Sequence, residues 1–142
     1  MNIFLDNNIC LDLLDSKRPT AKNSVQWYMK NKDDLNNNFY FSADSITTFY
    51  YVLTQKRKYD AKKTIMAIEA LSLEIIPFYI NHNDFTNARG DFFDEVFYDF
   101  EDLIILQSAL RVKSSKFITN DKKLLDLKSF YSLSIESPND LI

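Results

Sequence analysis

Residues 2–6 read Asn-Ile-Phe-Leu-Asp, a short apolar segment that ends at an acid. A run of Ile, Phe and Leu is typical of a buried strand, and Asp6 marks the point where that strand stops. The apolar spacing of residues 9–14 then predicts a helix. A strand that leads directly into a helix is the first unit of an alternating α/β fold.

The alternation continues to the end of the chain. We expect further strands at 39–41, 73–78, 116–119 and 131–135. We expect further helices at about 21–35, 81–89 and 99–112, a short one around 124–125, and a final turn from 137. Two more are expected to begin at N-caps: one runs from Asp44 or Ser45 to about 57, and the other from Asp60 through 71. Gly90 is expected to end the helix at 81–89. No linker or repeat interrupts the pattern. The sequence therefore predicts one α/β domain over residues 1–142, with a central parallel sheet of about four to five strands flanked by helices.

Composition narrows the class of protein. Hydrophobic residues make up 46% of the 142 residues, which is enough for a sizeable core. No apolar run is long enough to span a bilayer, and the N-terminus has no signal-peptide pattern. We therefore expect a cytoplasmic protein without membrane contact.

Residues that are rare in this chain exclude most kinds of catalytic site. Cys10, His82 and Gly90 are each the single residue of their type, so a Cys/His zinc cluster, a phosphate-binding glycine loop and a nucleophile elbow are not available. The 20 acidic residues remain. The net charge of −3 counts mildly against a nucleic-acid binder, but divalent cations held by acids can still attract phosphate. An enzyme of this composition is expected to work through carboxylates and a metal.

Four aspartates are placed to meet at one edge of the sheet. Asp6 and Asp121 each follow a predicted strand, and ligands of parallel sheets bind beyond the carboxyl ends of the strands. Asp99 and Asp102 are three residues apart near the start of one helix, so they share a face. Each acid also has a simpler interpretation as a helix cap or a first-turn residue. If the four converge, a cation must neutralise them or one must hold a proton, and oxygen ligands favour Mg²⁺ or Mn²⁺ over zinc.

At these residues the sequence resembles the PIN-domain nucleases, in particular VapC-like toxins of toxin–antitoxin pairs. The matching motifs, in family order, are Ile-Phe-Leu-Asp-Asn-Asn (3–8), Asp-Phe-Glu-Asp (99–102), Phe-Ile-Thr-Asn-Asp-Lys (117–122) and the closing Ile-Glu-Ser-Pro-Asn-Asp-Leu (135–141). Each motif is weak alone, but four in the right order are fairly specific, and they span nearly the whole chain.

The resemblance implies both an activity and a set of site residues. Asp6, Asp102 and Asp121 would ligate the metal, and Asp99 would be a further catalytic acid. Four further residues would support the site: Asn8 would brace Asp6, Thr119 and Asn120 would support the acids or contact phosphate, and the Thr48 hydroxyl would hydrogen-bond a metal-bound water. The activity implied is cleavage of RNA with Mg²⁺ or Mn²⁺. The partners implied are an RNA substrate, a cognate antitoxin and a second copy of the chain in a homodimer.

One position departs from the family pattern. Family members usually carry an acid on the helix after the second strand, and Thr48 occupies the matching position here. A hydroxyl can hydrogen-bond a water but supplies no charge. Asp44 lies one turn earlier, although a capping role suits it better than a substitute ligand. The departure keeps a second hypothesis open, in which the chain is a catalytically weakened PIN-like module that binds RNA or a protein.

Aromatic and basic residues outside these motifs give only weak indications of an RNA-binding surface. Aromatic residues 39–41 and 49–51 could stack on bases, but packing in a core or dimer is the expected role. Lys113, Lys116, Lys122 and Lys123 lie near Asp121 in the sequence and could contact RNA phosphates, although surface lysines are common.

Overall fold

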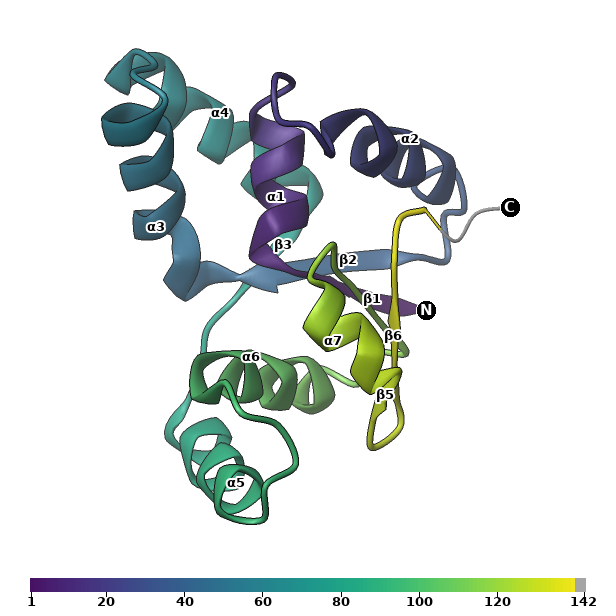
Figure 1. Ribbon diagram of the computed structural model, residues 1–142. Coiled ribbons are helices and arrows are strands. Elements are labelled where there is room, and N and C mark those ends of the chain that lie inside the picture. The colour runs from purple at the N-terminus through teal and green to yellow at the C-terminus, as the bar shows by residue number, and fades with distance from the viewer. Residues whose placement is uncertain (140–142) are drawn as a thin grey trace.

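The computed structural model describes residues 1–139, and within that range the strands form one six-stranded sheet. Its order is β3-β2-β1-β4-β6-β5 (Figure 1). The strands are β1 (Asn2–Leu5), β2 (Asn38–Ser42), β3 (Ile76–Phe78), β4 (Lys116–Ile118), β5 (Ser129–Phe130) and β6 (Leu133–Glu136). The neighbours from β3 to β6 are parallel, whereas β5 pairs antiparallel with β6. The expected α/β class is confirmed.

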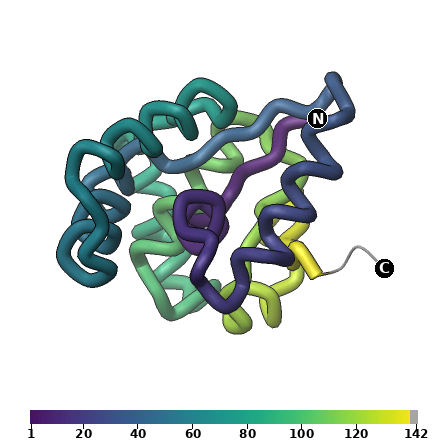
Figure 2. Tube along the Cα trace, turned by 90° about the horizontal axis from the view of Figure 1, so that it is seen from above, coloured from purple at the N-terminus to yellow at the C-terminus, as the bar shows by residue number. Residues whose placement is uncertain are grey.

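Helices cover both faces of the sheet. They are α1 (Asn7–Leu14), α2 (Ala21–Asn31), α3 (Ile46–Tyr51), α4 (Ala61–Glu74), α5 (His82–Phe93), α6 (Phe100–Arg111) and α7 (Lys122–Leu127). Helices α1 to α4 lie on one face, and α5 and α6 lie on the other (Figure 1). Seen from above, α1 stands nearly end-on between α2 and the α3–α4 pair (Figure 2).

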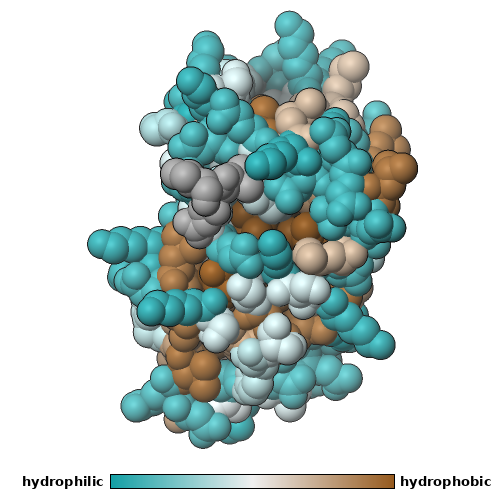
Figure 3. All heavy atoms as spheres, turned by 90° about the vertical axis from the view of Figure 1, so that its right-hand side faces the viewer, coloured by the Kyte–Doolittle hydropathy of each residue, from teal (hydrophilic) through white to brown (hydrophobic). Residues whose placement is uncertain are grey.

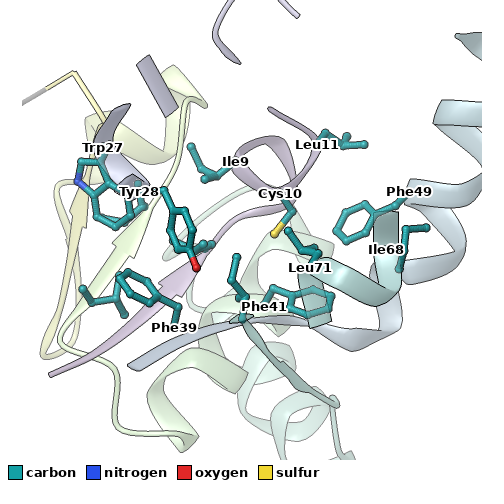
Figure 4. Close-up of a cluster of buried hydrophobic side chains, with 14 of the residues drawn as sticks. Ile9, Cys10, Leu11, Trp27, Tyr28, Phe39, Phe41, Phe49, Ile68 and Leu71 are labelled. Atoms are coloured by element: carbon teal, nitrogen blue, oxygen red, sulfur yellow. The ribbon is translucent and has the colours of Figure 1, made fainter. Parts of the chain in front are cut away.

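The alternation of side chains along β1 divides the interior into two cores. Ile3 and Leu5 point into the core beneath α1 to α4, and Phe4 points into the core on the other face, as the two-residue period of a strand requires. In the first core, Cys10 of α1 lies among the aromatic rings that β2 and α2 supply (Figure 4). Burial on both sides explains why this strand is apolar without interruption.

The second core explains the unusual composition of α6. Leu103, Leu106 and Ala109 are fully buried, and on the sheet the rings of Phe4 and Phe117 stack with centroids 5.8 Å apart. Helix α5 covers α6 from outside (Figure 1). A helix enclosed between a sheet and another helix buries most of its circumference, as the apolar sequence of 103–110 predicts.

Arg111 joins the end of α6 to α5 and to the segment after β3. Its Nε lies 3.2 Å from each carboxylate oxygen of Asp84, and its Nη2 donates to the carbonyl oxygen of Tyr79. The guanidinium also lies 4.2 Å from the ring centroid of Phe78. Asp84 is buried, and it caps its own helix reciprocally with Asn81. Arg111 therefore links α6 to α5 and to the segment after β3.

Several predicted boundaries differ from the structure. The strand expected at 131–135 begins at Leu133, because residues 131–132 form the turn of a hairpin with the two-residue strand β5. The sheet therefore has six strands in the described residues, one more than the upper end of our expectation. Helix α2 ends at Asn31, four residues early, and α5 continues through Gly90 to Phe93. A 3₁₀ turn at Ala43–Ser45 precedes α3, and a π-helical segment at Val52–Lys56 follows it.

The end of the chain tests only part of our expectation. Pro138 and Asn139 form a turn, and the rest of the final helical turn expected there, at Asp140 and Leu141, lies outside the described residues. The face shown in Figure 3 is largely hydrophilic, with smaller apolar areas between the polar side chains. None of the helices within residues 1–139 is long and apolar enough to cross a membrane.

Strands β1 and β4 end side by side, and this positions the candidate site. Leu5 is in register with Ile118, and the backbone N–H of Asp6 donates to the carbonyl of Ile118 over 2.9 Å. Thr119 continues the ladder toward β6 through its N–H, 3.0 Å from the carbonyl of Glu136. The residues that follow the two strands are therefore neighbours at the carboxyl edge.

Candidate metal centre

Three of the four candidate acids each cap a helix. Asp6 accepts a hydrogen bond from the N–H of Asn7 at the start of α1, over 2.7 Å. Asp99 accepts from the N–H of Asp102 at the start of α6, over 3.1 Å, and Asp121 accepts from the N–H of Lys123 at the start of α7, over 3.0 Å. Helix N-termini carry partial positive charge and stabilise carboxylates. The capping interpretation of these three acids is therefore correct, and the second oxygens of Asp99 and Asp121 take no part in the caps.

Asp6 is the most firmly held of the four acids. Only 7% of its surface is exposed, and its Oδ2 accepts from the hydroxyl of Thr119 over 2.7 Å and from the amide of Asn8 over 3.3 Å. The Thr119 hydroxyl oxygen in turn accepts from the N–H of Asp121 over 3.0 Å. Thr119 is fully buried between these two acids, so one hydroxyl sets the position of both.

Asn8 and Asn120 connect the loop after β4 to α1. The side-chain oxygen of Asn8 accepts from the N–H of Asn120 over 3.0 Å. The amide of Asn120 donates to Asp12 over 3.0 Å and to Ser24 over 3.3 Å. Because the amide of Asn120 is already used, a structural role is favoured over the phosphate contact that we also considered for it.

Asp12 is the centre of this network, although it belongs to none of the motifs that indicated the site. It is fully buried, and its carboxylate accepts from Arg18 Nε over 2.7 Å and from the hydroxyls of Thr20 and Ser24. The sequence signal was an acid between Leu11 and Leu13 in an otherwise apolar helix. Such an acid is more often on a solvated face, and its partners are spread from residue 18 to residue 120. Only the folded chain brings them together.

Electrostatics show that the four acids share one environment. Burial raises the pKa of Asp6 to about 6, and the charge of Asp121 adds to the rise. Burial also raises the pKa of Asp102 to about 7, with further contributions from the charges of Asp6, Asp99 and Asp121. Carboxylates that raise one another's pKa lie close enough to repel, and a cation bound between them would relieve that repulsion.

The donor set suits a hard divalent cation. It consists of carboxylate, hydroxyl and amide oxygens, with no sulfur or imidazole, which is the set that Mg²⁺ and Mn²⁺ prefer. Within residues 1–139, no three acidic, His or Cys side chains converge at ligating distance as they stand. Asp6 is fixed by its hydrogen bonds, so we expect Asp102 and Asp121 to rotate toward it when an ion binds. The ligand atoms are therefore of the type that the cation prefers, but the side chains of Asp102 and Asp121 must rotate before they can enclose it.

Thr48 and Asp44 have surroundings of their own in the structure. Thr48 is exposed on α3, and no hydrogen bond joins its side chain to the four acids in the described part of the chain. Asp44 Oδ2 accepts from the N–H of Ile80 over 2.8 Å, which ties the start of α3 to the segment after β3. Ser45 occupies the N-cap of α3 without a side-chain capping bond. Of the two expected caps, Ser45 therefore holds the N-cap position, whereas Asp44 binds a backbone amide outside its own helix.

The raised pKa of Asp102 predicts a pH-dependent stability of the metal-free protein. The pKa in the folded state, about 7, lies above the ordinary value of 3.8, so the folded state binds the extra proton and loses stability as pH rises from about 4 to about 7. Asp102→Asn removes this penalty. We expect it to be more stable than the wild type in EDTA at pH 8, by on the order of 2 kcal/mol after allowance for solvent screening.

The measurement is urea denaturation at pH 4.5 and pH 8. The stability gap between Asp102→Asn and the wild type should be several-fold smaller at the lower pH. The exposed Asp33 gives the matched control, since Asp33→Asn should show no gap at either pH. Equal stability of the wild type and Asp102→Asn at pH 8 would show that repulsion at Asp102 is negligible.

Comparison with known proteins gives a consistent result. The family model of the PIN domain matches residues 3–129. The chain is 36% identical over 143 residues to Ribonuclease VapC1 of Aquifex aeolicus (strain VF5), covering 94% of this chain and 87% of that protein.

Solved structures agree on the fold. VapBC-1 from nontypeable Haemophilus influenzae is similar with a TM-score of 0.71 at 18% identity, covering 99% of this chain and 100% of that one. VapBC2 from Rickettsia felis, solved bound to a promoter DNA fragment, gives 0.68 at 15% identity, with coverages of 96% and 98%. VapC20 from Mycobacterium tuberculosis, described as a toxin that cleaves the sarcin–ricin loop, gives 0.69 at 13% identity, with coverages of 93% and 98%. At these identities the structural likeness supports the fold alone.

Proposed function

This chain belongs to the PIN domain family, and on that premise we propose that it is a toxin endoribonuclease that hydrolyses RNA phosphodiesters with a divalent cation. The observation that carries the proposal is the cluster of Asp6, Asp102 and Asp121 at the carboxyl edge, where burial and mutual repulsion raise the pKa of two of the three. The 36% identical relative, a ribonuclease by name, supports the same activity.

We assign Asp6, Asp102 and Asp121 to the cation, which we propose is Mg²⁺ or Mn²⁺, and Asp99 to a supporting catalytic role. A divalent cation bound there would polarise the scissile phosphate and lower the pKa of an attacking water. Thr119 and Asn8 hold Asp6 in a fixed orientation through their hydrogen bonds. Asp102, with its raised pKa, is suited to keep a proton while the site is metal-free and to release it when an ion binds.

We further propose a cognate antitoxin as the protein partner, and a homodimer as the assembly. Two of the similar solved structures are VapBC structures, and the resemblance to VapC-like toxins implies the same kind of partner. A cytoplasmic location follows from the proposed RNA substrate. Light scattering of the purified chain tests the dimer directly.

The test of the activity is cleavage of single-stranded RNA by the purified chain. We expect cleavage with Mg²⁺ or Mn²⁺ and none with EDTA, and we expect the exposed variant Asp33→Asn to behave as the wild type. Isothermal titration with Mn²⁺ in the absence of RNA should show a site that Asp121→Asn weakens. Undiminished cleavage in EDTA, or cleavage with unchanged Mn²⁺ affinity in Asp121→Asn, would contradict the proposal.

The alternative is a PIN-like module that binds RNA or a protein without cleaving. Thr48 favours it, because the acid usual at that position is absent, and the carboxylate of Asp44, one turn earlier, accepts from the N–H of Ile80. The Mn²⁺ titration separates the two functions. A binding module should take up no Mn²⁺ at the acids, whereas an enzyme that tolerates Thr48 should bind it.

A further inference from the structure

The end of α5 and the loop that joins it to α6 carry a group of aromatic side chains, and this loop leads into Asp99. Phe92, Phe97 and Tyr98, with Glu95, line a surface hollow of about 360 Å³. That volume falls within the range that small-ligand sites occupy. The loop lies on the opposite side of the sheet from α3 (Figure 1), so it is separate from the aromatic residues 49–51 considered from the sequence.

The rings of this loop are more exposed than folding alone requires. Tyr98 is 59% exposed and Phe93 is 64% exposed, while Phe97 is half-buried against the second core. The centroids of the Phe97 and Tyr98 rings lie 4.8 Å apart, so the core-anchored ring supports the exposed one. An exposed group of large aromatic rings marks a surface that contacts something else.

Two cations lie over these rings. Lys123 Nζ is 4.7 Å from the ring centroid of Tyr98, and the Arg89 guanidinium is 4.3 Å from that of Phe93. Aromatic faces combined with basic groups are how proteins bind single-stranded nucleic acid, with bases on the rings and phosphates on the cations. Glu95 on the rim would repel phosphate, so the backbone of a bound strand belongs on the Lys123 side.

Two residues connect the hollow to the acids of the candidate metal centre. Tyr98 directly precedes Asp99, the cap of α6, and Lys123 donates its N–H to Asp121, the cap of α7. A strand with one base on Tyr98 would therefore carry the adjoining phosphate past Lys123 toward the acids.

We propose that Tyr98 and Lys123 form a platform that stacks an unpaired base of single-stranded RNA and holds its phosphate beside the acidic cluster. This inference rests on the proposed function for its substrate class. The pairing of cations with exposed rings, and the direct connection to the acids, favour RNA over a second copy of the chain as the occupant.

The experiment measures RNA binding in EDTA, so that it does not depend on cleavage. Fluorescence anisotropy compares a short single-stranded RNA with its blunt duplex. Tyr98→Ala should weaken binding of the single strand about tenfold, the scale of one lost base stack. Tyr98→Trp should restore it, and binding of the duplex should change little. Lys123→Gln should weaken binding and reduce the dependence of the affinity on salt.

The chain offers a matched control. Tyr51 is also exposed and has Lys56 Nζ 6.0 Å from its ring centroid, but it lies on α3. Tyr51→Ala should bind RNA as the wild type does. Thermal unfolding checks that Tyr98→Ala remains folded, as its exposure predicts.

The outcomes separate this inference from the proposed function. Unchanged single-strand affinity in Tyr98→Ala, or an equal loss for the duplex, would overturn the platform even if the chain cleaves RNA. A shift in light scattering from dimer to monomer in Tyr98→Ala, with RNA affinity retained, would assign the rings to an interface between copies and also overturn it. If the single-strand loss and the Trp rescue occur but no metal cleaves the RNA, the platform stands and the proposed cleavage fails.

Discussion

Replacing Asp6 by asparagine is expected to lower the rate of RNA cleavage by more than about 100-fold, since loss of a group that only supports a metal ligand already costs 10- to 100-fold. The carboxylate of Asp6 is held by the hydroxyl of Thr119 and the amide of Asn8. Asparagine replaces one oxygen with an NH₂ group that carries no charge and cannot accept from these donors. Initial rates with Mn²⁺, measured for both proteins on the same RNA, check the prediction.

This substitution also separates the two roles of Asp6. Asparagine is as good a helix cap as aspartate, so a residue that only caps α1 should tolerate it. Removal of a buried charge offsets the hydrogen bonds lost to Thr119 and Asn8, so we expect the melting temperature of the metal-free variant to stay near that of the wild type while cleavage is lost. Asp121→Asn should behave in the same way, because it caps α7. Cleavage within a few-fold of the wild type in Asp6→Asn would leave Asp6 with its capping role alone.

The positions of Asp6 and Asp121 were predictable from the sequence for a topological reason. Each follows an apolar strand, and adjacent parallel strands end at the same edge, as the register of Leu5 with Ile118 shows. Asp102 was predictable because a three-residue spacing keeps it on the same face as Asp99. The cap formed by Asp99 follows from local geometry, whereas the meeting of Asp102 with Asp6 and Asp121 was implied by the family resemblance.

The parts that could not be predicted depend on contacts between distant residues. Asp12 looks like a solvated acid of α1, but its partners come from the loop before α2, from α2 and from the loop after β4. Strand β5 has two residues and no periodicity to detect. Asp44 was expected to cap a helix, but its carboxylate instead accepts a hydrogen bond from the N–H of Ile80, 36 residues away. In each case, a polar group or a short segment takes its role from tertiary packing, which outweighs the local preference.

Arg111 is a further contact of this kind, and its removal should give the largest loss of stability among our predictions. Asp84 is 2% exposed, and of its partners Arg111 is the cation that neutralises it. Arg111→Met keeps much of the aliphatic contact with the ring of Phe78 but leaves a buried carboxylate unpaired. We expect a loss of about 3 kcal/mol, the low end of the range for removing one partner of a buried pair, because a third of the Arg111 side chain is exposed.

For a chain of this length the loss corresponds to a melting temperature about 10 °C lower. Calorimetry of the metal-free protein measures it, with Arg89→Met as the control, since the Arg89 side chain lies over the ring of Phe93 on the exposed surface of α5. The double variant Arg111→Met with Asp84→Asn should regain part of the loss. Asparagine removes the unpaired charge, while its oxygen can still accept from the N–H of Asn81 in the cap of α5.

That recovery distinguishes the cause of the destabilisation. If the unpaired charge of Asp84 is responsible, neutralising it helps only when Arg111 is absent, and the two substitutions are not additive. If Arg111 acts mainly through the carbonyl of Tyr79 and the ring of Phe78, Asp84→Asn will destabilise both backgrounds equally. Additive losses in the double variant would therefore reject the ion pair as the main link between α5 and α6, and would assign that link to the contacts of Arg111 with the segment after β3.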